Sequence, residues 1–262
     1  MKKLTLYFLF LTTITYAQPK ITWPGHKKAV IVLTYDDALK SQLDVAVPQL
    51  VSAKFKATFF LTGDINFITI PRWRAISKKG FELANHTLYH PCITSNDNPV
   101  ASETYTPNTI VREIGAMNYL LFAVDGKTSR TYAYPCTETT VGGKSYVDTL
   151  RKAGLVKYAR VGGDVEAVIT DFKNLDPLQI PSYGVEDGAT GGQLVAFVKR
   201  VQQSGGLGIY MVYGIGDDYL TTPATSHREL LEYLKNNMKD IWVATFQQAM
   251  DYVTAQLKQN KG

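Results

Sequence analysis

Short apolar runs rich in β-branched and aromatic residues alternate along the chain with segments whose apolar residues recur at helical spacing. The first run, KAVIVLT at residues 28–34, is typical of a buried parallel strand. Further strands are expected at 57–61, 81–83, 131–134, 158–161, 207–213 and 241–245. Helices are expected at 39–54, ending at 76–80, at 108–122, 146–152, 193–203 and 227–236, and after the last strand. This alternation predicts an α/β fold, either a (β/α) barrel or a doubly wound sheet.

The N-terminal residues have the features of a secretory signal peptide. Lys2 and Lys3 precede an apolar run that ends at the small residue Ala17. We therefore expect a signal peptide at 1–17, a single domain over 18–262, and a secreted or periplasmic protein. Residue 18 is Gln and no Cys lies nearby, so no lipid or membrane anchor is expected after cleavage.

The charge of the chain argues against a nucleic-acid partner. The formal net charge is +5, and it falls to +3 once Lys2 and Lys3 are removed. A basic excess of this size, spread along the chain, does not form the positive patch that nucleic-acid binding needs. Neutral or weakly acidic partners are the expected class.

Polar side chains lie where several of the expected strands end: Asp36, Asp37, His86, Cys136 and Tyr213. In a parallel barrel the carboxyl ends of the strands meet on one face, and the chemistry is found there. We therefore expect these side chains to converge.

Two of the four histidines, His86 and His90, are four residues apart. On a helical turn or tight loop this spacing directs both imidazoles the same way, so that they can share one metal ion. The alternative is a pair of unrelated packing histidines. Thr87 stands where an HExxH zinc protease has its Glu, and two imidazoles rarely hold a divalent ion alone. A carboxylate at a strand end is the expected third ligand.

Asp36 and Asp37 are adjacent carboxylates at the end of the first strand. One can bind a metal ion while the other takes a proton from water, although an isolated pair can also be a solvated turn. The two cysteines, Cys92 and Cys136, each follow a proline directly. In an exported protein we expect them to form a disulfide beside the site, with two free buried thiols as the alternative.

The motifs TYDD at 34–37 and NHTLYH at 85–90 resemble the first two motifs of the polysaccharide deacetylases, the NodB-homology enzymes of carbohydrate esterase family 4. The resemblance extends from about residue 28 to 252. It implies a distorted (β/α)7–8 barrel and metal-dependent removal of acetyl groups from a glycan.

The resemblance also implies roles for individual residues. Asp37, His86 and His90 match the family's ligands for one divalent ion, commonly Zn²⁺, with Co²⁺, Ni²⁺ and Mn²⁺ as alternatives. Asp36 matches the catalytic base. The third motif is AYPC at 133–136, in which the backbone N–H of Cys136 takes the position that helps to bind the oxyanion.

Two departures from the family pattern are expected to matter. Ala133 stands where the family has an arginine that holds the base; Arg160 is the candidate replacement, with a surface salt-bridge residue as the alternative. Tyr213 stands where the family has the histidine that protonates the leaving group. We favour His227 as this acid, with Tyr213 orienting the substrate. The alternatives are a surface His227 with the Tyr213 hydroxyl as donor, or an O-acetyl substrate that needs little help. His26, in a polar N-terminal segment, is not expected to take part.

These observations together predict an enzyme, a metal-dependent deacetylase of an N- or O-acetylated polysaccharide or oligosaccharide, which we expect to be monomeric. One rival interpretation is a carbohydrate-binding pseudoenzyme that kept the fold and lost turnover. Another is a hydrolase of a different non-peptide C–N bond. Retention of both Asp36 and Asp37 favours the enzyme, because a binding module has no need of the base.

Overall fold

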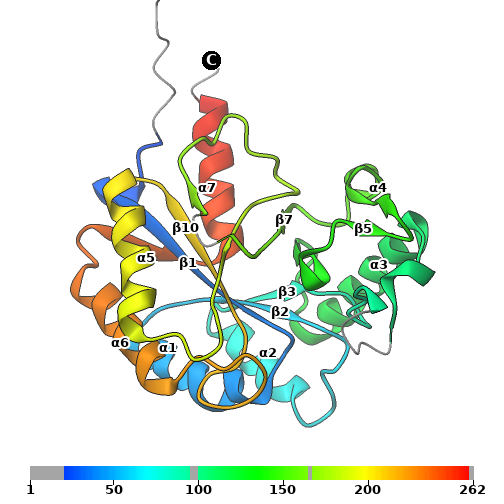
Figure 1. Ribbon diagram of the computed structural model, residues 1–262, viewed down its shortest axis with the longest axis horizontal. Coiled ribbons are helices and arrows are strands. Elements are labelled where there is room, and N and C mark those ends of the chain that lie inside the picture. The colour runs from blue at the N-terminus through cyan, green and yellow to red at the C-terminus, as the bar shows by residue number, and fades with distance from the viewer. Residues whose placement is uncertain (1–20, 95–99, 165–166, 260–262) are drawn as a thin grey trace, which may run out of the picture.

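The computed structural model describes residues 21–94, 100–164 and 167–259 (Figure 1). The expected signal peptide, residues 1–17, lies outside the described residues. The strands are β1 (Ala29–Asp36), β2 (Thr58–Leu61), β3 (Glu82–Asn85), β4 (Thr131–Ala133), β5 (Thr140–Val141), β6 (Lys144–Ser145), β7 (Tyr158–Arg160), β8 (Val168–Ile169), β9 (Tyr183–Gly184), β10 (Leu207–Val212) and β11 (Ile241–Ala244). The helices are α1 (Val47–Ala53), which continues a π-helical turn at Gln42–Ala46, α2 (Ile70–Lys78), α3 (Pro107–Asp125), α4 (Val147–Ala153), α5 (Gly191–Ser204), α6 (Ala224–Asn236) and α7 (Phe246–Gln259).

The main sheet is a curled parallel half-barrel. Its strands run in the order β7-β4-β3-β2-β1-β10-β8, with β11 added to β1 and β9 to β10. All of these pairings are parallel except that of β8. With helices surrounding the sheet, this is the expected distorted (β/α) barrel (Figure 1).

The two faces of β1 bury different halves of the core. Ile31, Leu33 and Tyr35 pack against a layer that includes α1, α5 and α6. Val30 and Val32 point the other way, into the curl of the sheet, where α7 covers them. Because side chains alternate along a strand, Asp36 belongs to the same face as Val30 and Val32. The inside of the half-barrel is thus apolar at the amino end of β1 and acidic at its carboxyl end.

The structure confirms the main strands and helices and adds details that the sequence pattern did not predict. The strands β5, β6, β8 and β9 are two residues long, which is too short for a period of two to be detected. Helix α6 begins at Ala224, three residues before the expected start at 227. Among the described residues no helix is long and apolar enough to cross a membrane.

Candidate active site

Asp36 ends the central strand β1, Asp37 follows it, and both carboxylates approach Nε2 of His86. Asp36 is the last residue of β1 and is 1% exposed. Asp37 leaves the strand with a left-handed backbone (φ 77°), while its N–H still donates to the carbonyl of Phe60 at 3.1 Å. The change of backbone direction lets neighbouring carboxylates face one space from two sides.

His86 and His90 lie on a tight loop after β3. The N–H of His86 continues the sheet by donating to the Leu61 carbonyl at 3.0 Å. Thr87 and His90 both have positive φ, 67° and 49°. The Asn85 side chain accepts from the Thr87 N–H at 2.8 Å, and the Thr87 hydroxyl accepts from the His90 N–H at 2.9 Å. These bonds fold the loop so that both imidazoles meet.

Glu113 of α3 binds the backbone of this loop, a role that was not predicted from the sequence. Its carboxylate accepts from the backbone N–H groups of Leu88 at 3.1 Å and Tyr89 at 2.9 Å. The hydroxyl of Tyr105 donates to its other oxygen at 2.7 Å. An acidic residue inside an amphipathic helix belongs to no recognisable sequence motif. Glu113 stands out only because it is 8% exposed, which is known from the structure and not from the sequence.

The atoms that could ligate a metal ion lie at the separations a small ion requires. The Nε2 atoms of His86 and His90 are 3.2 Å apart, and Asp37 Oδ1 is 3.4 Å from each. A four-coordinate zinc with bonds of ~2.0–2.1 Å places its ligands ~3.3 Å apart. Asp37 Oδ1 is also buried without a hydrogen-bond partner within the described ranges. The donor set, two imidazoles and a carboxylate, therefore fits one zinc-sized ion and leaves a position open.

The His86 ring is oriented for metal binding. Its Nδ1–H donates to the Ala133 carbonyl at 2.9 Å, which directs Nε2 toward Asp37. Burial, together with the neighbouring His86, lowers the pKa of His90 below the usual histidine range. A neutral His90 ring is the form that ligates metal ions.

Asp36 is held by Arg160, which reaches it from β7. Nη2 of Arg160 donates to Asp36 Oδ2, and Nη1 donates to the Ser182 hydroxyl at 3.1 Å. Arg160 is paired with Ala133 in the sheet, so the guanidinium enters from the strand next to the one where the family's arginine was expected. It is 1% exposed, which excludes the alternative of a surface salt bridge.

The environment of Asp36 makes it a stronger base than an exposed aspartate. Burial raises the pKa of its carboxyl, and the charges of Arg160 and His86 only partly offset this effect. Its second oxygen, Oδ1, is buried and has no hydrogen-bond partner among the described residues. Since His86 Nε2 lies 3.9 Å from Oδ2, the carboxylate borders the candidate metal position and can accept a proton there.

Cys92 and Cys136 form the expected disulfide, with a Cα–Cα distance of 5.8 Å. Cys92 is buried, and its Sγ lies 3.6 Å from Nδ1 of His90. Cys136 has a left-handed backbone (φ 50°) in the turn that follows β4. The bond therefore joins the histidine loop to the turn that would present the Cys136 N–H.

Tyr213 directly follows β10 and borders the same site. Thr34 pairs with Met211 and Tyr35 with Val212, which places Tyr213 beside Asp36. Its ring is half-buried, and the nearby Asp36 adds to the effect of burial in raising the pKa of its hydroxyl.

His227 does not join these residues, contrary to the expectation that it is the proton donor. Its Nε2 is 2.6 Å from the Tyr35 hydroxyl and its Nδ1 is 2.6 Å from Oε1 of Gln49. Tyr35 points to the helix-covered face of β1, so His227 lies behind the sheet from Asp36. The expected helix started three residues too late; in α6 the ring belongs to the first turn and faces inward, 1% exposed.

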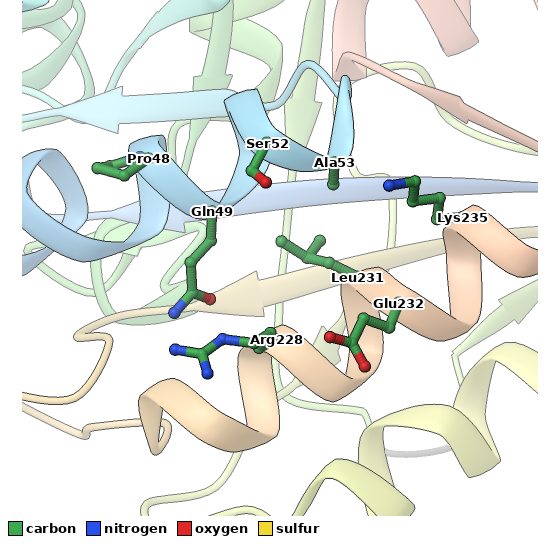
Figure 2. A pocket seen from close by; sticks show the side chains of 8 residues that line it. All are labelled: Pro48, Gln49, Ser52, Ala53, Arg228, Leu231, Glu232 and Lys235. Atoms are coloured by element: carbon green, nitrogen blue, oxygen red, sulfur yellow. The ribbon is translucent and has the colours of Figure 1, made fainter.

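A cavity of about 320 Å³ opens beside His227 but holds none of the site residues. Figure 2 shows it between α1 and α6, with Gln49 extending from α1 toward Arg228. Its lining is Pro48, Gln49, Ser52, Ala53, Arg228, Leu231, Glu232 and Lys235. This cavity and the candidate site lie on opposite faces of the sheet. His26 also lies apart, in a turn at Pro24–His26 that precedes the amino end of β1.

Comparison with known proteins gives the family. Residues 24–156 match the model of the polysaccharide deacetylase family. No curated protein matches the chain.

Solved structures of this kind share the fold over most of the chain. A protein of Mycobacterium smegmatis assigned to the polysaccharide deacetylases has a TM-score of 0.64 at 18% identity, covering 93% of this chain and 96% of its own. A family 4 acetyl xylan esterase from Clostridium thermocellum in complex with cobalt has a TM-score of 0.54 at 19% identity, covering 84% and 89%. A pseudoenzyme of the same carbohydrate esterase family has a TM-score of 0.54 at 17% identity, covering 86% and 67%.

Proposed function

Because the chain belongs to the polysaccharide deacetylase family, we propose that it is a metal-dependent hydrolase that removes N- or O-linked acetyl groups from a polysaccharide or oligosaccharide. The observation that carries this proposal is the approach of three ligand atoms, from Asp37, His86 and His90, to within 3.4 Å of one another beside a buried carboxylate. That arrangement combines a place for an ion with a base beside it.

Asp37, His86 and His90 would hold one divalent ion, and zinc is the ion that suits two imidazoles and a carboxylate, with Co²⁺, Ni²⁺ and Mn²⁺ as alternatives. Such an ion supplies Lewis acidity that polarises an acyl carbonyl and makes water easier to deprotonate. The structural neighbour with cobalt is consistent with an ion of this class.

The residues around the ion divide the remaining work. Asp36 accepts the proton of the attacking water, and Arg160 fixes the orientation of that carboxylate. The backbone N–H of Cys136 donates to the oxyanion that develops on the acetyl carbonyl, and the disulfide to Cys92 holds that turn in place. Tyr213 orients the sugar beside Asp36.

We further propose that the mature protein is residues 18–262, exported to the periplasm or medium after loss of 1–17, and that it acts as a monomer on an acetylated glycan. The disulfide supports an oxidising compartment, since such bonds persist outside the cytoplasm.

Metal analysis and an acetate assay test the proposal together. Purified protein is expected to hold one zinc ion per chain, and His86→Ala and His90→Ala are expected to lose it. With the metal present, the protein should release acetate from one of a panel of acetylated xylans and chitin oligomers. Tight glycan binding and full metal content with no acetate release would instead establish the rival function, a carbohydrate-binding pseudoenzyme.

A further inference from the structure

Tyr213 borders the candidate site directly after β10, beside Asp36. The register of β1 and β10 places this residue next to Asp36, and the side-chain amide of Gln42 donates to the backbone carbonyls of both Asp36 and Tyr213, the latter at 3.2 Å. A substrate whose water is activated by Asp36 therefore has Tyr213 as its neighbour. The position of the phenol is set by the two central strands of the sheet.

The ring of Tyr213 is fixed, and its hydroxyl faces a weak partner. Tyr219 packs edge-on against it with ring centroids 5.8 Å apart. The hydroxyl donates to the thioether of Met211 at 3.7 Å, and sulfur is a poor hydrogen-bond acceptor. The hydroxyl can exchange this contact for a substrate oxygen at little cost.

No imidazole is left to protonate a leaving group. The chain has four histidines, and all four lie in described residues. His86 and His90 face Asp37 as candidate ligands. His227 is bonded behind the sheet, and His26 precedes the amino end of β1, whereas the site is at its carboxyl end.

Esters and amides differ in what they require at this point. When the tetrahedral adduct of an acetyl ester collapses, the C–O bond breaks, its electron pair leaves on oxygen, and the alkoxide takes a proton from solvent while Asp36 returns its own proton to solvent, which gives the free hydroxyl and acetate. In an acetamide the C–N bond breaks only once the nitrogen carries a proton, because the nitrogen anion is far more basic. An acid beside the nitrogen is then needed, and a phenol of pKa ~10 supplies a proton much less readily than an imidazolium of pKa ~6.5.

We propose that this site is specific for O-acetyl esters of carbohydrates and discriminates against N-acetyl amino sugars, because no histidine is free to act there and Tyr213, which borders Asp36, donates a hydrogen bond rather than a proton. The inference rests on the proposed function and narrows it from acetylated glycans to acetyl esters.

The test compares two substrates with the same backbone. Chitotetraose carries acetamides on a β-1,4-linked glucose skeleton, and O-acetylated cellotetraose carries acetate esters on that skeleton. Acetate release by the zinc-loaded protein should give a kcat/KM for the ester at least ~10²-fold above that for the amide, the scale of one general acid. Tyr213→His supplies an imidazole and should raise the amide-to-ester ratio of kcat/KM by ~10-fold or more. Tyr119→His, at a 77% exposed position on α3, is the matched control and should leave the ratio unchanged.

The outcomes separate the two claims. Comparable cleavage of both substrates by the wild-type protein overturns the ester specificity and leaves the deacetylase function standing. An unchanged ratio in a folded Tyr213→His protein also overturns it, since the missing imidazole would then not be the cause. Absence of metal-dependent acetate release from either substrate overturns the proposed function itself, and the ester specificity with it.

Discussion

The guanidinium of Arg160 donates a hydrogen bond to Asp36 across a sequence separation of 124 residues. Arg160 lies on β7, at one edge of the sheet, and Asp36 ends β1, with β4, β3 and β2 between them. Ala133 is the partner of Arg160 in the sheet register. The arginine and the base are thus kept together although the arginine comes from a different strand from the family motif.

Arg160→Lys is expected to lower kcat/KM by ~10²-fold, because a lysine cannot hold Asp36 and Ser182 at once and the base loses its orientation. Arg151→Lys, an exposed ion-pair variant, is the control and should behave as wild type. The double variant Arg160→Ala with Ala133→Arg should recover part of the loss. If Arg160→Lys has the kinetics and pH profile of the wild type, Arg160 does not orient Asp36.

Glu113→Ala is expected to weaken metal binding by ~10- to 100-fold, the usual effect of losing a residue that orients a ligand. The variant frees the backbone N–H groups of Leu88 and Tyr89 and loosens the loop that carries His90. Competition with a zinc chelator measures the change. Glu113→Gln keeps an oxygen acceptor and should lie between wild type and Glu113→Ala. An unchanged affinity in both variants would show that the loop is held without Glu113.

Loss of the Cys92–Cys136 bond is expected to cost ~2–4 kcal/mol of unfolding free energy, because the bond closes a loop in the unfolded chain. Urea unfolding of the Cys92→Ser, Cys136→Ser protein measures the cost. A dithiol reductant should destabilise the wild type and leave the double variant unaffected. Equal sensitivity of the two proteins to the reductant would contradict the assignment.

His227 is expected to make stability fall with acidity. Burial lowers its pKa to about 3 in the folded protein, below the ~6.5 of an unfolded histidine. The unfolded chain therefore binds the extra proton between these values, so this contribution is complete above pH ~6.5 and is lost progressively as the pH falls toward 3.

At pH 5 the loss amounts to about 2 kcal/mol relative to neutral pH. His227→Gln preserves a donor and an acceptor for Gln49 and Tyr35 but cannot titrate. The difference in unfolding free energy between wild type and variant should shrink by that amount from pH 7 to pH 5. A difference that stays constant would mean that the fold does not lower the pKa of His227.

Local patterns in the sequence predicted much of the molecule. The apolar runs predicted the two longest strands, β1 and β10, best, because both are buried on both faces and contain Val and Ile. The motifs around Asp37 and His86 predicted that Asp37, His86 and His90 meet, since four-residue spacing and adjacent carboxylates are both local features. The pairing of Cys92 with Cys136 was predicted from the compartment and is confirmed.

One error came from a local signal that was misread, and one omission came from packing that is not local. Pro223 precedes α6 and signals a helix start at Ala224, but the expected helix was begun at His227, and this ring, which faces the core behind the sheet, was expected to be the proton donor at the site. Glu113 reaches its partners only because α3 packs beside β3. Such contacts depend on how elements pack, and no spacing in the chain encodes them.

The central claim is that Asp36 is the base beside an ion held by its neighbours, and one measurement tests it directly. Acetate release from an acetylated glycan should be compared for the wild type and Asp36→Asn at equal zinc content. The variant should keep one ion per chain, because the ligands Asp37, His86 and His90 are intact, and should be slower by ~10²-fold or more, as expected for loss of a general base. Zinc-loaded Asp36→Asn that releases acetate at the wild-type rate would contradict the account.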